Sequence, residues 1–262
     1  MNLYPQAPQS IGKVLDTGFS MYRAVLKPIL PLSLLLAVLA QLPQMAPYLI
    51  AAGGPLAGLA VVVGFFVWFV AYLALYNGWI ISTDSLARGG PALKVGQAFS
   101  TGLPKVLTVI GAVLLYALAV AGGTVLLVVP GLILMISLFF FWYLALLENQ
   151  GAIDSLKGSH RLVWGNWWRT VAVVSVGGLV YFVAYFIVFG ISAAVLGLSA
   201  VRGPTPGEAA TGPGLGLLVF VAAQIVLNAV LMPMWNSLML VLFRELQLRK
   251  SGADLAARAA AA

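Results

Sequence analysis

Long apolar stretches without a charged residue alternate along this chain with shorter segments that hold almost all of its charge. Residues 28–83, 106–147, 170–201 and 215–243 contain no Asp, Glu, Lys or Arg. An α-helix rises about 1.5 Å per residue and needs about 20 residues to cross a bilayer. The first two stretches are each long enough for two crossings and the last two for one each, so the pattern predicts six transmembrane helices.

Proline and glycine residues divide the longer stretches into separate crossings. In the second stretch Pro130-Gly131 is the expected hinge, because proline is tolerated in the first turn of a helix. Gly122-Gly123 is the alternative hinge, and Pro130 would then kink the fourth helix. A segment rich in Gly and Pro, residues 201–214, separates the last two spans as a loop. We place the six spans near 25–42, 57–82, 106–128, 130–147, 170–199 and 215–243.

Composition agrees with a membrane protein. Of the 262 residues, 62% are hydrophobic and only 8% are charged, whereas a soluble domain carries roughly 25% charged residues. Such a chain has too little charge to cover its surface in water. We therefore predict an all-α integral membrane protein in which residues 1–250 form one six-span domain and residues 251–262 form a flexible, Ala-rich tail.

The basic residues lie almost entirely on one side of this predicted topology. Thirteen of the 14 Lys and Arg residues fall in segments 1–27, 83–105, 148–169 and 244–262, and Arg202 is the exception. Basic residues collect on the cytoplasmic side of membrane proteins. Both termini of this multi-pass protein are therefore expected in the cytoplasm. The topology also explains the net charge of +7, so no nucleic-acid partner is expected.

Each of the first three cytoplasmic segments carries an amphipathic pattern before a pair of spans. Apolar residues recur at helical spacing near 11–26, 95–106 and 153–167, and Ser10 is a plausible N-cap of the first pattern. Superposing the three patterns aligns Phe19 with Phe99 and His160. The pattern predicts amphipathic interfacial helices in a threefold repeat of one interfacial helix plus a helix pair. Three unrelated interfacial helices are the alternative.

The middle of the chain resembles a known family. The residues that carry the resemblance are Val128-Val129-Pro130-Gly131, Leu132, Ile133, Glu148, Gly151-Ala152-Ile153, Ser155-Leu156, Ser159, Arg161-Leu162, Trp164, Asn166 and Trp167-Trp168. This stretch resembles the YciC-like family of bacterial inner-membrane proteins and is similar to the membrane domain fused to some glycerophosphoryl diester phosphodiesterases. The resemblance implies a six-span inner-membrane protein. No soluble stretch is long enough for the phosphodiesterase domain, so no catalytic residue is carried over.

The residues needed for catalysis or metal binding are sparse. The chain has no cysteine and one histidine, His160, so neither a thiolate nor a histidine metal site is expected. Asp154, Ser159 and His160 have hydrolase-like identities, but Ser159 and His160 are sequence neighbours and point in different directions on a helix. We expect no catalytic site, no metal and no cofactor, and we expect that the protein is not an enzyme.

Two groups of residues are candidate contact sites. Near the third amphipathic pattern, basic and aromatic side chains could contact lipid headgroups or a partner protein, with simple anchoring of the fifth span as the favoured alternative. On the sixth span, polar side chains could face a substrate, with interhelical hydrogen bonding as the favoured alternative. The first group is Lys157, Arg161, Trp164, Trp167, Trp168 and Arg169, and the second is Gln224, Asn228 and Asn236.

These observations favour a non-enzymatic inner-membrane protein that interacts with lipids or partner proteins and supports membrane homeostasis. A transporter or channel for a small or lipid-like substrate is the first alternative, and an accessory subunit of a membrane complex is the second. A cavity lined by the spans would favour transport, whereas dry packing would favour the other two.

Overall fold

The computed structural model describes residues 2–47, 50, 53, 57–196 and 215–252, and every regular element in these ranges is a helix. The predicted loop 201–214 and most of the predicted tail lie outside the described residues. The elements in chain order are α1 (Ile11–Leu39), η1 (Leu42–Met45), α3 (Ala57–Ala87), α4 (Val95–Gly102), η2 (Leu103–Lys105), α5 (Val106–Leu126), α6 (Val128–Ser137), α7 (Phe141–Leu147), α8 (Ala152–Val163), α9 (Trp167–Leu196) and α11 (Leu215–Lys250).

Six helical stretches are long and apolar enough to cross a membrane. They begin at Ile11, Gly58, Val95, Val128, Trp167 and Leu218. The predicted all-α membrane fold with six spans is thereby confirmed. Most helices extend beyond the predicted spans at the end that carries the basic residues, because backbone hydrogen bonding continues past the last apolar turn.

The first amphipathic pattern and the first span form one continuous helix, α1, rather than a short interfacial helix followed by a span. Ser10 caps this helix as predicted, since its side chain accepts a hydrogen bond from the Lys13 amide. One buried face runs the length of α1 from Val14 to Leu36 and packs on α11, so no break is favoured between the two parts. Pro28 and Pro31 lie inside the helix without ending it.

The hinge between the third and fourth spans is at Leu127, between the two predicted positions. Leu127 has an extended backbone (φ −162°, ψ 144°) and separates α5 from α6. Pro130 lies in the first turn of α6, where its missing N–H has no helical partner to lose. Gly123 and Gly131 do not bend the chain, and instead let α5 and α6 approach closely, because a Cβ on Gly131 would clash with Thr124.

The fourth span is interrupted at residues 138–140, between α6 and α7. Ser159 of α8 bonds to the backbone on both sides of the interruption, because its hydroxyl accepts from the Phe140 amide (2.9 Å) and donates to the Ser137 carbonyl (3.0 Å). Backbone groups in a membrane protein must find partners inside the protein. Ser159 is therefore a structural residue that stabilises the break.

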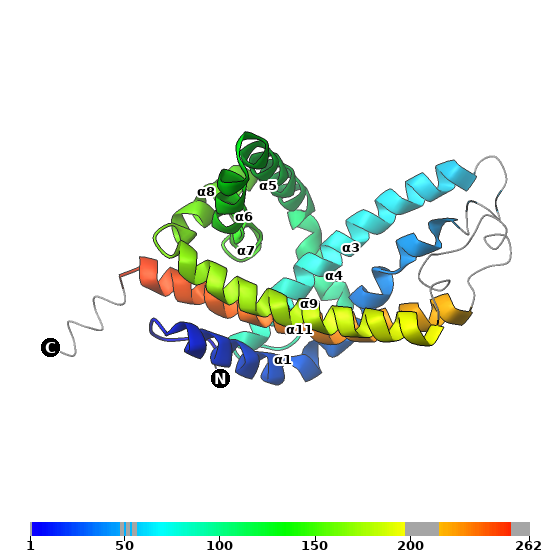
Figure 1. Ribbon diagram of the computed structural model, residues 1–262, viewed down its shortest axis with the longest axis horizontal. Coiled ribbons are helices and arrows are strands. Elements are labelled where there is room, and N and C mark those ends of the chain that lie inside the picture. Colours follow the sequence, from blue (N-terminus) through cyan, green and yellow to red (C-terminus); the bar gives the residue numbers. More distant parts are fainter. Residues whose placement is uncertain (1, 48–49, 51–52, 54–56, 197–214, 253–262) are drawn as a thin grey trace.

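The spans form a bundle with a second group of helices beside it. Figure 1 shows α1, α9 and α11 running alongside one another, with α5, α6, α7 and α8 gathered to one side and α3 inclined across the bundle. Two of the amphipathic segments pack on the span that precedes them in the chain, α4 on α3 and α8 on α7. The first segment, at the start of α1, has no preceding span, and α1 packs on the last span, α11. This arrangement is the one expected of the threefold repeat, which stays a prediction.

Ion pairs join the charged segments at one end of the bundle, called here the basic end and marked by Asp84, Glu148, Arg169, Arg244 and Glu245. Arg244 contacts Asp84 (3.1 Å) and Glu148 (2.8 Å), which follow different spans. The Tyr4 hydroxyl donates to Asp84 (2.7 Å), so the N-terminal segment is held at the same end. Burial and the nearby Asp84 carboxylate raise the pKa of Tyr4, which keeps its hydroxyl protonated as a donor.

Candidate functional site

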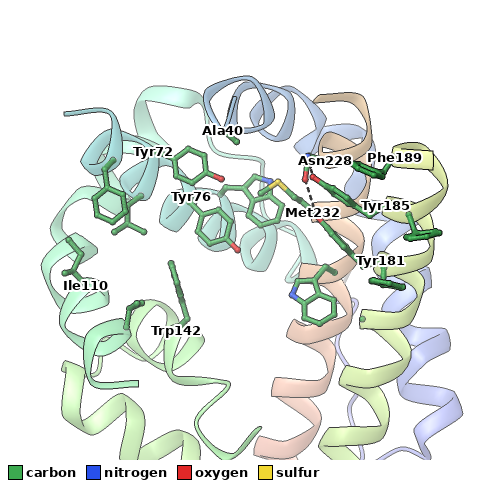
Figure 2. Close-up of a pocket in the computed structure, with 18 of the residues that line it drawn as sticks. Ala40, Tyr72, Tyr76, Ile110, Trp142, Tyr181, Tyr185, Phe189, Asn228 and Met232 are labelled. Atoms are coloured by element: carbon green, nitrogen blue, oxygen red, sulfur yellow. Dashed lines mark hydrogen bonds between the residues drawn. The ribbon is translucent and has the colours of Figure 1, made fainter. Parts of the chain in front are cut away.

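A large cavity of about 1040 Å³ lies among the spans, between α3, α5, α9 and α11. Ligand pockets typically have volumes of about 300–1,000 Å³, so this cavity could hold a whole small molecule or part of a lipid. Its walls are mainly aromatic. Figure 2 shows Tyr72 and Tyr76 on one wall, with Tyr181, Tyr185 and Phe189 facing them across the space.

One wall of the cavity carries a hydrogen-bond set centred on Asn228. The Asn228 side-chain oxygen accepts from the Tyr181 hydroxyl (3.1 Å), and its amide donates to the Tyr185 hydroxyl (3.1 Å). The same amide also donates to the Gln224 carbonyl (2.8 Å). These bonds link α9 to α11 and fix the Tyr181 and Tyr185 rings, which stack on each other with centroids 5.7 Å apart.

The facing wall carries two hydroxyl groups without such partners. Tyr72 and Tyr76 are half-buried on α3, and neither hydroxyl forms a hydrogen bond with the residues that the structure describes. The Tyr76 ring lies between Trp79 and Trp142, with centroids 5.6 and 5.4 Å away. Aromatic packing therefore fixes the Tyr76 ring, while its hydroxyl has no partner in the described part of the chain.

Polar groups on both walls lie well inside the spans. Tyr72, Tyr185 and Asn228 each lie 16 residues from a basic residue of the basic end, namely Arg88, Arg169 and Arg244 respectively. At about 1.5 Å per residue this separation is about 24 Å, within a hydrocarbon core about 30 Å thick. These three side chains therefore lie inside the membrane, away from the basic end.

The three polar residues predicted to form one face of the sixth span have different surroundings in the structure. Asn228 lines the cavity, whereas Asn236 is buried and accepts from the Tyr143 hydroxyl (2.9 Å). Gln224 is also buried, outside the cavity lining, and its side-chain oxygen has no partner among the described residues. Asn228 and Asn236 both form hydrogen bonds to tyrosines of other helices, which is the interpretation that the sequence favoured.

A second, smaller cavity of about 610 Å³ lies between α6 and α8 and is called here the α8 groove. Its polar rim contains Lys157 and Arg161, two of the predicted contact residues, and both are exposed. Its remaining lining residues are Leu134, Leu138, Asp154, Leu156 and His160. The groove thus places two basic side chains beside an apolar floor.

The three predicted tryptophans next to this groove differ in burial. Trp164 and Trp168 are 56% and 78% exposed, and Trp164 stacks with His160 at 5.1 Å. Trp167 is half-buried, and its ring N–H donates to the Ile133 carbonyl (3.3 Å). Trp164 and Trp168 are consequently free to contact lipid, while Trp167 helps attach α9 to α6.

Arg169 occupies a different position from the other predicted contact residues. Its guanidinium contacts the fully buried carboxylate of Glu245 (3.0 Å) and donates to the Gln9 carbonyl. Arg249 contacts the same carboxylate and the same carbonyl. Arg169 therefore joins α9, α11 and the N-terminal segment inside the protein and is not part of the α8 groove.

The aromatic cavity was not predicted from the sequence. Its strongest signal is a pair of tyrosines four residues apart on each of two spans, Tyr72 with Tyr76 and Tyr181 with Tyr185. Such spacing puts both rings of a pair on one helix face. That two such faces point at each other depends on how the spans pack, which a pattern on single helices does not encode.

The residues with hydrolase-like identities are not arranged for hydrolysis. Ser159 is occupied by the backbone bonds at the break in the fourth span, and His160 stacks on Trp164. Among the described residues there is no group of three His, Cys, Asp or Glu side chains that could hold a metal ion.

Comparison with known proteins adds one similarity. A family model described as a domain of unknown function, DUF7847, matches residues 117–246, from the second half of α5 to near the end of α11. No curated protein and no solved structure matches the chain. Over that part of its length, which includes the α8 groove and one wall of the cavity, the chain is therefore similar to DUF7847.

Proposed function

We propose that this integral membrane protein is a non-enzymatic protein of the bacterial inner membrane that binds anionic lipids at the inner leaflet. The single observation that carries the proposal is the α8 groove, where Lys157 and Arg161 share one cavity with Leu134 and Leu138. An anionic phospholipid has the matching form, a charged headgroup followed by apolar chains. The resemblance to the YciC-like family, which stays a prediction, supports the same membrane.

The charges of the groove favour an anionic headgroup. Neither Lys157 nor Arg161 forms an ion pair with the residues that the structure describes, although Asp154 lines the same groove. The planar guanidinium of an arginine matches the geometry of a phosphate. Each basic residue near an anionic leaflet contributes about 1 kcal/mol. The two together therefore bias lipid choice by about 2 kcal/mol, while the spans hold the protein in the membrane.

The apolar side chains around the groove support an interfacial position for α8. Ile153, Trp164 and Trp168 are exposed on the outer side of this segment. Aromatic and aliphatic side chains of interfacial helices enter the boundary between headgroups and acyl chains. This placement puts Lys157 and Arg161 at headgroup level.

The experiment compares two double variants that remove equal charge. Lys157→Gln with Arg161→Gln empties the groove of basic side chains, and Arg23→Gln with Lys27→Gln removes two exposed basic residues of α1 at the same spacing. Retained lipids are measured by mass spectrometry after extraction in mild detergent. We expect the groove variant alone to lose anionic lipid. Equal loss in both variants, or no loss in either, would contradict a specific site.

A second candidate function, movement of a small or lipid-like molecule, is favoured by the intramembrane cavity. Transport requires that the cavity be reached from both sides of the membrane. The chain has no native cysteine, so Met232→Cys, in the cavity wall, can be labelled with impermeant thiol reagents in oriented vesicles. Labelling from both sides supports transport, and labelling from one side or neither excludes an alternating path through this cavity.

A further inference from the structure

We infer that the intramembrane cavity is a binding site for a neutral, lipid-soluble molecule that presents a carbonyl oxygen to the hydroxyls of Tyr72 and Tyr76. The inference goes beyond the proposed function and is independent of it, because the cavity and the α8 groove have no lining residue in common. Failure of one proposal therefore leaves the other standing.

The walls favour an apolar, partly planar ligand. Aromatic rings contact the space from three helices and the α7 segment, among them Phe69, Trp79, Trp142, Phe182, Phe186 and Trp235. Rings prefer to stack on or meet the edges of other rings at centroid distances of about 4.5–7 Å. A void among such rings forfeits dispersion contacts on one side. A ligand with a ring or a flexible chain restores those contacts.

The absence of charge in the lining favours a neutral ligand. Among the residues that the structure describes, those that line the cavity include no Asp, Glu, Lys, Arg or His. An ion moved to membrane depth without a counter-charge loses its hydration and is strongly disfavoured. A quaternary ammonium could gain from the aromatic faces, but no carboxylate lies in the described part of the lining to neutralise it. Cationic and anionic ligands are therefore selected against.

The hydroxyls of Tyr72 and Tyr76 favour an oxygen acceptor. On the α9 and α11 wall, Tyr181 and Tyr185 already bond to Asn228. On the α3 wall, the hydroxyls of Tyr72 and Tyr76 have no partner in the described part of the chain, and water is scarce at this depth. Away from water, a hydroxyl without a hydrogen-bond partner is unfavourable. A ligand carbonyl would accept from these phenol groups and relieve that cost.

The donors are held in place before a ligand arrives. Tyr72 stacks on Tyr76 at 6.2 Å and on Trp68 at 5.4 Å, while Trp79 and Trp142 confine Tyr76. Trp142 is itself fixed, because its ring N–H donates to the Asn77 side chain (3.1 Å). Fixed donors lose little conformational freedom on binding. The α3 wall thus presents hydroxyl donors that are already held in place for a ligand carbonyl.

Two sources share this carbonyl chemistry, namely the ring carbonyl of a quinone and the ester carbonyl of a neutral diacylglycerol. Binding is measured on the purified full-length protein in detergent by quenching of tryptophan fluorescence with a decyl-substituted benzoquinone, since Trp79, Trp142 and Trp235 line the cavity. Dioctanoylglycerol is tested by competition with the quinone and by native mass spectrometry. Decylbenzene and decyltriphenylphosphonium serve as the apolar and cationic comparison probes.

Three variants distinguish the contribution of the Tyr72 and Tyr76 hydroxyls to binding from that of the cavity volume. Tyr72→Phe with Tyr76→Phe keeps both rings and removes only the donors, so carbonyl probes should bind about tenfold more weakly. Tyr22→Phe, at a half-buried tyrosine of α1 outside the cavity, should leave affinity unchanged. Met232→Trp places a larger side chain in the cavity wall and should weaken binding of every probe.

The result expected is saturable binding of at least one carbonyl probe, sensitive to the double phenylalanine variant, and the better probe identifies the source. Four results would overturn the inference. They are binding of neither carbonyl probe, equal affinity for decylbenzene, unchanged affinity in the double phenylalanine variant, and competition by the phosphonium.

Discussion

Arg169 and Glu245 form an ion pair of 3.0 Å between the first turn of α9 and the last turns of α11, and the Glu245 side chain is fully buried. Arg249 contacts the same carboxylate, and both arginines donate to the Gln9 carbonyl. One acid thus holds two guanidinium groups and the chain segment that precedes α1. The pairing fixes the start of the fifth span relative to the end of the sixth.

The Glu245→Gln variant should lower stability by about 3 kcal/mol, because breaking a buried pair leaves charge without its partner. Thermal unfolding in detergent, followed by size-exclusion chromatography, measures the loss. The control Asp16→Asn, at an exposed acid of α1, should change little. Combining Arg169→Gln with Glu245→Gln should cost less than the sum of the single changes. Strict additivity would show that Arg169 acts elsewhere, for example on lipid.

The Ser159→Ala variant should destabilise the protein by about 1–3 kcal/mol, since it leaves the Phe140 amide without an acceptor inside the membrane domain. Ser155→Ala is the matched control. Ser155 is also buried on α8, but its hydroxyl bonds only to the Ala152 carbonyl of its own helix. Thermal unfolding of the two variants decides the matter. Equal losses would show that burial of a hydroxyl on α8 matters more than the bond to the break.

The presence of six membrane spans could be predicted from the sequence because each span depends on local composition. A run without charge, such as 28–83, cannot fold in water and has a fixed length per crossing. The Ser10 cap was predictable for the same reason, since a cap needs only its own helix. The continuity of α1 could not be predicted from the sequence, because it depends on the buried face from Val14 to Leu36, which packs on α11.

The candidate sites illustrate the same distinction. Lys157 and Arg161 could be chosen from the sequence because basic charge beside tryptophan is a local signal. Arg169 carries the same signal, yet its partner Glu245 is 76 residues away. The sequence likewise placed Asn228 on a helix face but did not connect it with Tyr181 and Tyr185. Side chains that lie on different spans come into contact only when the helices pack together. The position and lining of the cavity depend on the same packing.

The Gly78→Ala variant should destabilise the contact between α3 and α4. A Cβ on Gly78 would clash with the Ala98 carbonyl, and one on Gly102 would clash with the Ala74 carbonyl. The two helices approach through backbone, as small residues permit in membrane proteins. Overpacking of this kind costs about 1–3 kcal/mol. Gly64→Ala is the control on the same helix, because its Cβ meets no atom within 4 Å. A similar unfolding temperature for both variants would contradict the close approach.

The orientation of the whole bundle can be tested with single cysteines, because the native chain has none. Ser251→Cys follows α11 at the basic end, and Thr211→Cys lies in the predicted outer loop, outside the described residues. In intact cells an impermeant thiol reagent should label Thr211→Cys and spare Ser251→Cys, which should react only after the membrane is opened.

The physical reason for this expectation is that Arg244 joins Asp84 and Glu148, and Glu245 joins Arg169. These pairs hold the ends of the second, fourth, fifth and sixth spans at one side. Basic residues are retained on the cytoplasmic side during insertion, so all of these ends should lie there together. Labelling of Ser251→Cys in intact cells would show that the bundle has the opposite orientation. The α8 groove would then lie in the outer leaflet, which would contradict the proposed inner-leaflet lipid site.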